Sequence, residues 1–326
     1  MKAVALIYSP KEGAPGRTER RWRKICRYLE LKGLDFDYVR SDGHKEVERL
    51  AAMFATSGCS TIVVVGGDAA LNSALCGILS AKDTMTKLPA LGVIPNGYGN
   101  DFARFWGLPA DDWRVAAEAV LHRHTRKVDV GVAKEITEPE TANELPAGSK
   151  DGKSTEPQEQ SKTWYFLNCL NLGVVASVTN LRRRMRRLLL LDTFSYFISS
   201  FCLIFAKMGY TLSFCLPGEK VNQQGMTMCV GSAKGYGLTP SAVPYNGLLD
   251  ITLVKHPRFS QTIHGLWLLY TGRFLSHRGI SVWRTKSLRI NDCNKIPVSI
   301  DGRMIQPKAH KLSVNIMPEV LDFVIP

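Results

Sequence analysis

The stretch Val63-Val64-Val65-Gly66-Gly67-Asp68 decides the fold, because a short apolar run leads directly into two glycines and an acidic residue. A helical pattern follows over 69–81, so the stretch predicts a buried strand, a tight turn and a helix. Glycines in such a turn let backbone N–H groups approach a phosphate, and the helix N-terminus adds the positive end of its dipole. The same residues also suit a plain turn in which Asp68 only caps the helix, and the stretch alone does not decide between these interpretations.

The chain around this stretch alternates strands and helices. Strands are predicted over 3–8, 36–40, 61–65 and 90–94, and helices over 18–32, 44–57 and 69–81. This alternation favours a parallel sheet with helices on both faces. Ligands in such sheets bind at the carboxyl ends of the strands, where the turn at Gly66 and Gly67 lies.

A second glycine-rich turn follows the next apolar strand, in Ile94-Pro95-Asn96-Gly97-Tyr98-Gly99-Asn100-Asp101-Phe102-Ala103-Arg104. Two such turns at neighbouring strand ends are expected to form one anion-binding cleft. Asn100 and Asp101 can orient a phosphate or a metal ion, and Arg104 can neutralise charge.

The composition favours anionic partners. The chain has 326 residues, with 42 Lys and Arg against 29 Asp and Glu, so its formal net charge is +13. This charge suits phosphates, nucleic acid or an acidic membrane face. The eight cysteines are scattered without metal-ligand spacing, which predicts reduced thiols in a cytoplasmic protein.

The second half of the chain has a different pattern. Residues 134–162 carry almost no bulky apolar residue, so we expect a disordered insertion in a loop that joins two strands. Short apolar segments then predict a mostly antiparallel sheet or sandwich, with strands over 163–170, 212–216, 226–231, 249–254, 287–291, 298–301 and one or two over 312–325. Helices are predicted at about 180–208 and 259–276.

Further motifs follow in order along this half. They are NCLNLG over 168–173, GYGLTPSAVPYNGLLD over 235–250 and SIDG over 299–302. Together with the two glycine turns, they resemble the diacylglycerol kinase catalytic-domain family, bacterial lipid kinases related to sphingosine and ceramide kinases. The resemblance implies a lipid-kinase architecture, with an α/β nucleotide-binding domain over 1–131, a β-sandwich lipid-binding domain over 132–326, and ATP with Mg²⁺ in the cleft between them.

The resemblance also implies roles for individual residues. The nucleotide-binding residues implied are Ser9, Gly66, Gly67, Asp68, Asn72, Gly97, Gly99, Asn100, Asp101 and Arg104. Catalytic positions are implied at Asp68, Asp301 and Arg303, and weak metal-binding positions at Asn246 and Asp250.

Several positions depart from the family's pattern near the phosphates. Where the family has Gly-Gly-Asp-Gly-Thr-Leu-Asn-Glu, this chain has Gly-Gly-Asp-Ala-Ala-Leu-Asn-Ser over 66–73. Ala70 has no hydroxyl to donate to a phosphate oxygen, Tyr98 replaces a small hydroxyl residue, and Glu12 adds negative charge to the first loop. A hydrogen bond to a charged group contributes about 1.5–3 kcal/mol, so we expect ATP and Mg²⁺ to bind more weakly.

Two later departures concern the chemical step. Asn246 replaces an Asp that helps to organise Mg²⁺ in the family, and an amide lacks the charge that a hard cation prefers. Arg303 replaces the Glu implied as general base, and a guanidinium cannot accept a proton. Losing a general base costs about 10²- to 10⁴-fold in rate. We therefore expect a pseudokinase whose phosphate transfer is weak or lost; the alternative is an active lipid kinase in which a displaced carboxylate, that of Asp68, Asp101, Asp301 or Asp250, is the base.

A run of arginines precedes a long apolar stretch. The run consists of Arg182, Arg183, Arg184, Arg186 and Arg187. It suits contact with an anionic membrane surface, which predicts a cytoplasmic protein peripheral at the inner membrane face, or a basic membrane-surface adaptor without a ligand. Asp192 and several hydroxyl residues disfavour a membrane span, and a helix packed on the sandwich is the alternative. No aromatic-plus-basic strand motif accompanies the charge, so nucleic acid is not an expected partner.

Overall fold

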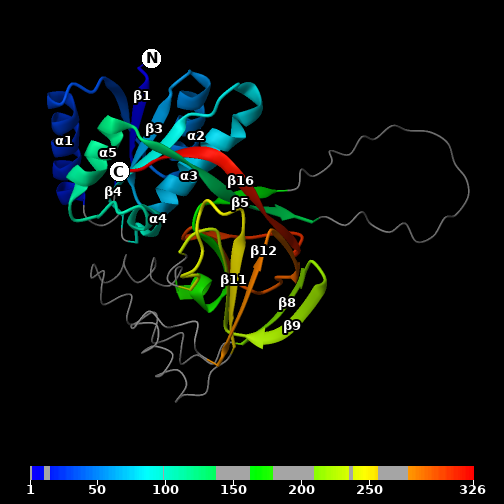
Figure 1. The fold of residues 1–326 in the computed structure, drawn as a ribbon. Coiled ribbons are helices and arrows are strands. Elements are labelled where there is room, and N and C mark those ends of the chain that lie inside the picture. Colours follow the sequence, from blue (N-terminus) through cyan, green and yellow to red (C-terminus); the bar gives the residue numbers. More distant parts are fainter. Residues whose placement is uncertain are drawn as a thin grey trace, which may run out of the picture.

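The structure is a computed structural model (Figure 1), and it describes residues 2–10, 15–97, 99–136, 162–178, 209–234, 238–255 and 278–326. These residues form an N-terminal α/β unit and a C-terminal β-sandwich, as predicted. All seven cysteines within the described ranges are free thiols.

The N-terminal unit contains a parallel sheet between two pairs of helices. Its strands are β1 (Val4–Tyr8), β2 (Phe36–Arg40), β3 (Thr61–Gly66) and β4 (Ala90–Pro95), in the order β2-β1-β3-β4. Its helices are α1 (Pro15–Leu31), α2 (His44–Thr56), α3 (Asp68–Ser80), the short α4 (Asp101–Phe105) and α5 (Trp113–His122), with a 3₁₀ turn at Lys82–Thr84. Helices α1 and α5 pack together on one face of the sheet, and α2 and α3 on the other (Figure 1).

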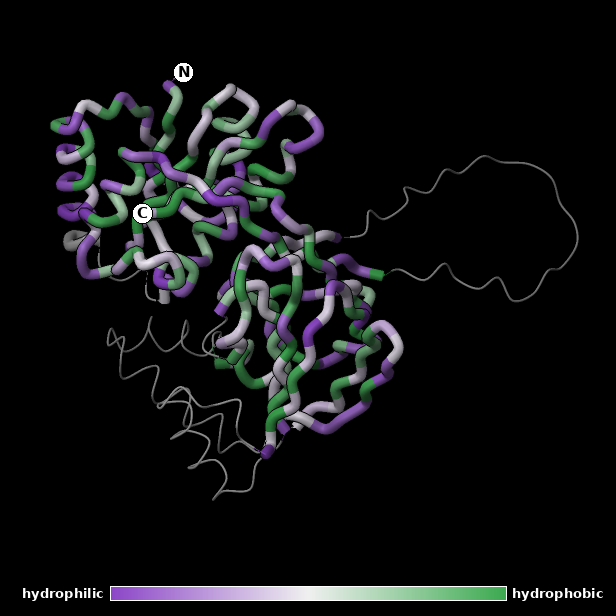
Figure 2. The backbone as a smooth tube through the Cα atoms, in the orientation of Figure 1, coloured by the Kyte–Doolittle hydropathy of each residue, from purple (hydrophilic) through white to green (hydrophobic). Residues whose placement is uncertain are grey.

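Burial explains why these segments form these elements. Every residue of β1 and β3 is buried, as expected of strands covered on both faces. Trp22, Ile25 and Leu29 lie on the buried side of α1, while Figure 2 shows hydrophilic residues along its outer turns. Helices α2 and α3 approach closely, since a Cβ on Gly77 would lie 2.1 Å from the carbonyl oxygen of Glu48.

Two long strands join the N-terminal unit to the sandwich. Strands β5 (Thr125–Glu135) and β16 (Leu312–Val324) pair antiparallel along most of their length, with a register shift between Met317 and Leu321. Phe323 of β16 pairs in parallel with Leu91 of β4, so the last strand returns to the N-terminal sheet, as predicted. The expected domain boundary at 131 falls inside β5, and the chain passes through it as one continuous strand.

The sandwich consists of the far end of this mixed sheet and a second, antiparallel sheet. The remaining strands are β6 (Thr163–Phe166), β7 (Cys169–Gly173), β8 (Tyr210–Leu216), β9 (Glu219–Gly225), β10 (Thr227–Gly231), β11 (Leu249–Val254), β12 (Ile280–Thr285), β13 (Ser287–Asp292), β14 (Val298–Ile300) and β15 (Arg303–Ile305). The first sheet runs β2-β1-β3-β4-β16-β13-β8-β9, with β5 and β6 beside β16, and the second runs β12-β11-β10-β7-β14-β15. Apolar side chains of both sheets, such as Phe214 and Ile251, form the core between them.

Some predictions about the second half need correction. The single strand predicted over 163–170 is wrong, because the chain breaks into β6 and β7 at Leu167 and Asn168, whose N–H groups bond to the carboxylate of Asp301 instead of a strand. Strands β9, β12 and β15 are not predicted, since β9, for example, reads EKVNQQG and has little apolar character.

Other predictions concern segments that lie wholly or partly outside the described residues. Strand β5 continues to Glu135 and Lys134 pairs with Thr163 of β6, so the expected start of the insertion at 134 is wrong, although the segment does join two neighbouring strands. Residues 137–161 lie outside the described residues. The helices predicted near 180–208 and 259–276, and with them all five arginines from 182 to 187, also fall outside. Among the helices that are described, none has the length and apolar character needed to span a membrane.

Candidate active site

The two glycine turns lie against each other at the carboxyl ends of β3 and β4. Gly66 and Pro95 are neighbours in the sheet register, and the N–H of Asn96 donates to the carbonyl oxygen of Gly66 at 2.8 Å. A Cβ on Gly97 would lie only 2.4 Å from the Cα of Gly67. The turns therefore lie side by side at one edge of the sheet, as predicted, and they meet backbone to backbone, an approach that only glycine permits.

The end of β1 joins the same edge. The N–H of Ser9 donates to the carbonyl oxygen of Val65 at 3.0 Å, and a Cβ on Gly66 would lie 3.3 Å from the Cβ of Ser9. Three strand ends thus surround the start of α3, where backbone N–H groups are available to an anion.

Asp68, the first residue of α3, ties the two turns together. Its carboxylate accepts hydrogen bonds from the N–H groups of Asp101 at 3.1 Å and Phe102 at 3.2 Å. Burial raises the pKa of Asp68, and these donors act in the opposite direction. A Cβ on Gly99 would lie 3.0 Å from Oδ2 of Asp68 and 2.9 Å from Oδ2 of Asp101, so both carboxylates border the space at Gly99.

The side chain of Asn100 stabilises the second turn through hydrogen bonds to its backbone. Its backbone has a left-handed φ of 52°, its Oδ1 accepts from the N–H of Gly97 at 2.9 Å, and its Nδ2 donates to the carbonyl oxygen of Gly97 at 3.1 Å. Arg104 donates from Nη2 to the carbonyl oxygen of Gly99 at 2.7 Å, and its side chain is 70 % exposed. In this arrangement Asn100 supports the loop, and Arg104 lies at its outer rim.

Asp301 connects the sandwich to this edge. Asp301 and Gly302 have φ values of 43° and 79° and form the two-residue turn between β14 and β15, an Asp-Gly sequence typical of such hairpins. The buried carboxylate accepts from the N–H groups of Leu167 at 2.8 Å, Asn168 at 3.0 Å and Cys169 at 2.9 Å. Asp301 therefore holds the break between β6 and β7 in place.

Asn72 and Asn168 complete a network between the two units. Nδ2 of Asn72 donates to Oδ2 of Asp301 at 3.2 Å and to the carbonyl oxygen of Tyr165 at 2.7 Å. Nδ2 of Asn168 donates to Oδ1 of Asp68 at 3.3 Å. Asp301 thus has four donors, yet its burial raises the pKa of the carboxyl group to about 7.

Arg303 follows the Asp-Gly turn and reaches α3. Its Nη1 donates to Oγ of Ser73 at 3.0 Å and to Oδ1 of Asn72 at 3.4 Å. Asp68 and Asn72 are four residues apart on α3, so they share the helix face that meets the sandwich. The half-buried Arg303 therefore lies beside the Asp68 network, at the position that the resemblance assigns to the general base.

The proposed metal positions do not converge. Asp250 forms a two-point ion pair with Arg284, with Oδ1 to Nε at 2.6 Å and Oδ2 to Nη2 at 3.1 Å. Asn246 is exposed, and its Oδ1 accepts from the N–H of Leu248 at 3.0 Å. These two side chains do not fit a Mg²⁺ site, and in the described part of the chain no three His, Cys, Asp or Glu side chains gather as metal ligands.

Sequence reasoning missed several residues of the site. Asp129 on β5 is buried, and its carboxylate accepts from the N–H groups of Gly247 at 2.6 Å and Glu319 at 3.0 Å, which fixes the loop that carries Asn246. An Asp inside the apolar run VDVGV is a signal that could have found it. Ser73 stands in a quoted motif, whereas nothing in the sequence marks Arg284 as the partner of Asp250.

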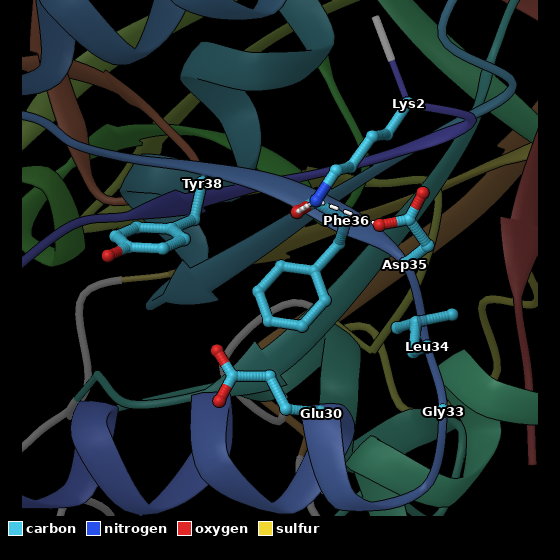
Figure 3. A pocket seen from close by; sticks show the side chains of 7 residues that line it. All are labelled: Lys2, Glu30, Gly33, Leu34, Asp35, Phe36 and Tyr38. Carbon is cyan, nitrogen blue, oxygen red and sulfur yellow. Dashed lines mark hydrogen bonds and ion pairs between the residues drawn. The ribbon is translucent and has the colours of Figure 1, made fainter.

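A separate pocket of about 350 Å³ lies elsewhere, at the amino ends of β1 and β2 (Figure 3). Nζ of Lys2 pairs there with Oδ1 of Asp35 at 2.8 Å and donates to the carbonyl oxygen of Phe36 at 3.1 Å. The glycine turns occupy the opposite edge of the sheet, so this pocket is not part of the candidate active site.

Comparisons with known proteins agree with this architecture. Residues 3–133 match the family model described as diacylglycerol kinase catalytic domain, and residues 168–325 match the YegS C-terminal NAD kinase beta sandwich-like domain. A diacylglycerol kinase from Mycobacterium tuberculosis is 26% identical over 333 residues, which cover 99% of this chain and 95% of that protein. A diacylglycerol kinase from Bacillus subtilis is 20% identical over 93% of this chain and 90% of its own length.

The fold has a counterpart among solved structures. The crystal structure of a diacylglycerol kinase from Bacillus anthracis str. Sterne matches with a TM-score of 0.64 at 15% identity, over 100% of this chain and 97% of that one. At 15% sequence identity, this similarity is evidence for a shared fold only.

Proposed function

The chain belongs to the diacylglycerol kinase catalytic-domain family, and from that premise we propose that it binds ATP and a lipid between its two units, with phosphate transfer that is weak or lost. The observation that carries the proposal is the contact of Arg303 with Ser73 and Asn72 at the implied base position. A guanidinium there can bind an anion but cannot take a proton from a lipid hydroxyl.

The glycine turns support nucleotide binding. Bare backbone at Gly67, together with the first turn of α3, offers N–H groups to phosphate oxygens, while Gly97 lets the second turn pack against it. Ala70 lies beside Gly66, where a Cβ on the glycine would be 3.0 Å from that of Ala70, so a Thr at position 70 would carry its hydroxyl toward this turn. Its absence weakens ATP binding without removing the backbone donors.

The donor set for Mg²⁺ differs from the one that the resemblance implies. Asp68 and Asp101 border the same space at Gly99, and two carboxylates with nucleotide phosphates and water are a common Mg²⁺ environment. These two residues would hold the ion, which when bound neutralises phosphate charge. As they stand, the amide of Asn246 and the Arg284-paired carboxylate of Asp250 do not act as ligands of the ion.

The remaining carboxylates are poorly placed to replace the missing base. Asp301 accepts four hydrogen bonds, and Asp250 is paired with Arg284. Asp68 borders the space at Gly99, and on it rests the second candidate function, an active lipid kinase with Asp68 as a displaced base in place of a Mg²⁺ ligand.

The decisive experiment separates binding from turnover. ATP at millimolar concentration should raise the melting temperature, since a ligand that binds only the folded state stabilises it by RT ln(1 + [L]/Kd). Incubation with γ-labelled ATP, Mg²⁺ and a total lipid extract should give no labelled lipid above background. The absence of a melting shift would contradict nucleotide binding, and robust labelling would favour the active kinase.

The proposed membrane contact rests on sequence. The five arginines from 182 to 187 would bind an anionic surface, such as the inner membrane face. Replacing Arg183, Arg184, Arg186 and Arg187 by Gln should reduce sedimentation with anionic vesicles. The difference between wild type and variant should become smaller at high salt, because salt screens the charges. Equal sedimentation of both proteins would contradict this role.

A further inference from the structure

We propose that Arg303 forms an anion site on the acceptor side of the cleft, and that the ligand bound there is a lipid whose headgroup already carries a phosphate. The inference rests on the proposed function in one respect, namely that a lipid occupies this side of the cleft. The proposed function does not specify the charge of that lipid, and the inference adds that its headgroup is negative.

The geometry of Arg303 leaves part of its guanidinium available. Nη1 makes two hydrogen bonds, to Oγ of Ser73 at 3.0 Å and Oδ1 of Asn72 at 3.4 Å. These two contacts anchor the guanidinium on α3 and fix its plane. Nε and Nη2 have no hydrogen-bond partner among the described residues, and this edge of a guanidinium can bind a phosphate through two parallel bonds.

No carboxylate of a described residue neutralises Arg303. In the described part of the chain, no Asp or Glu oxygen lies within ion-pair distance of it, unlike Arg284, which is paired with Asp250. The oxygens of Asp301 already accept four hydrogen bonds, so this carboxylate cannot turn toward Arg303 without leaving buried N–H groups unpaired. A half-buried cation without a counterion in the protein is stabilised by an anionic ligand.

The groups that hold Arg303 leave its positive charge uncompensated. Ser73 and Asn72, which accept from Nη1, are both uncharged. A neutral headgroup needs no such cation, whereas a phosphate ester gains a charge-assisted bidentate contact. Ser73 also serves the cation directly, because its hydroxyl accepts from Nη1 while donating to the carbonyl oxygen of Ala69 at 3.1 Å.

The site is separate from the turn that would bind the nucleotide. Ser73 lies five residues after Asp68 on α3, which corresponds to about 7.5 Å along the helix axis. Arg303 itself belongs to β15 of the sandwich, not to the N-terminal unit. A phosphate held by Arg303 is therefore distinct from those held at Gly66 and Gly67.

Water-soluble lipids test the inference without a membrane surface. Isothermal titration calorimetry would compare dihexanoyl phosphatidic acid, dihexanoylglycerol and inorganic phosphate, each below any micelle-forming concentration and without ATP. The wild type should bind the phosphatidic acid at least about tenfold more tightly than dihexanoylglycerol, the size of one charge-assisted hydrogen bond. Arg303→Gln should lose this preference, and Arg303→Lys should keep part of it.

A matched control separates the site from overall charge. Arg23→Ala removes one positive charge from α1, where the side chain is 78 % exposed, and should keep the preference. Equal affinity for the two lipids, or an unchanged preference in Arg303→Gln with an unchanged melting temperature, would overturn the inference. Inorganic phosphate that binds as tightly as the phosphatidic acid would overturn the assignment to a lipid, and competition by ATP would assign the anion to the nucleotide site instead.

Failure of the anion site can be distinguished from failure of the proposed function. An ATP-induced melting shift without a phosphatidic-acid preference would remove the anion site and leave the proposed function intact. An Arg303-dependent preference without any ATP shift would support the anion site and remove nucleotide binding.

Discussion

Asn72 and Asp301 stand 229 positions apart in the chain, and Nδ2 of Asn72 donates a 3.2 Å hydrogen bond to Oδ2 of Asp301. The contact joins α3, which begins at the first glycine turn, to the hairpin turn that precedes Arg303. Asp301 also accepts from three successive backbone N–H groups of the sandwich, so one carboxylate links the break between β6 and β7 to the helix that follows the first glycine turn.

This relationship predicts a large structural effect of Asp301→Ala. The substitution leaves three buried backbone N–H groups without an acceptor, at about 1–3 kcal/mol each, so the free energy of unfolding should fall by at least about 3 kcal/mol. Urea unfolding followed by circular dichroism measures this loss. Asp35→Ala, whose carboxylate is 79 % exposed, is the control and should have a far smaller effect. A comparably small loss in Asp301→Ala would show that the carboxylate does not hold the β6–β7 break.

The same carboxyl group predicts a pH dependence of stability. Burial raises its pKa to about 7 in the folded protein, against about 3.9 in an unfolded chain, so the folded state binds more protons between these values. Stability from this group is complete below about pH 4 and is lost as the pH rises through about 7, by up to about 1.4 kcal/mol per pH unit. Urea unfolding from pH 5 to 8 should show this fall, and Asp301→Asn should flatten it. Identical slopes in both proteins would contradict the shifted pKa.

The N-terminal sheet could be predicted from sequence because its signals are local. Apolar runs such as Val63–Val65 end at glycines, so strand ends and turns coincide in the sequence. The meeting of the two turns followed from the rule that parallel strands end at one edge, and the contact between Gly67 and Gly97 agrees with it.

The rest of the site depends on contacts that sequence does not encode locally. The pairing of Asp250 with Arg284 requires the register of β11 and β12, in which the two residues are direct neighbours, and this register cannot be read from the sequence of either strand. The break at Leu167 depends on a carboxylate 134 positions later in the chain. Asp301 was expected to be catalytic on the strength of its motif, whereas its contacts are those of a residue that holds the backbone in position.

The contact between the glycine turns predicts a specific loss of nucleotide binding. In Gly97→Ala, the new Cβ would lie 2.4 Å from the Cα of Gly67 and 2.8 Å from Oδ1 of Asn100, so the turns must separate. ATP affinity, taken from the melting temperature over a range of ATP concentrations, should fall at least about tenfold, the equivalent of one hydrogen bond to a phosphate. Gly43→Ala is the matched control, because its Cβ would meet nothing within 4 Å. Equal ATP affinities of the two variants would contradict a nucleotide site at these turns.

The departures at four positions predict that activity can be restored. Ala69→Gly and Ala70→Thr rebuild the phosphate turn, Asn246→Asp returns a carboxylate to the loop fixed by Asp129, and Arg303→Glu supplies a proton acceptor beside Oγ of Ser73. The wild type should show no lipid phosphorylation above background with γ-labelled ATP, and the fourfold variant should show Mg²⁺-dependent transfer.

The control for this experiment is the threefold variant that keeps Arg303. It should bind ATP as well as the fourfold variant does but remain about 10²- to 10⁴-fold less active, since a general base contributes that factor. Matching melting temperatures would establish that both variants are folded. Robust wild-type turnover that Arg303→Ala leaves unchanged would instead show that a carboxylate is the base, with Asp68 and Asp101 at Gly99 the first to test.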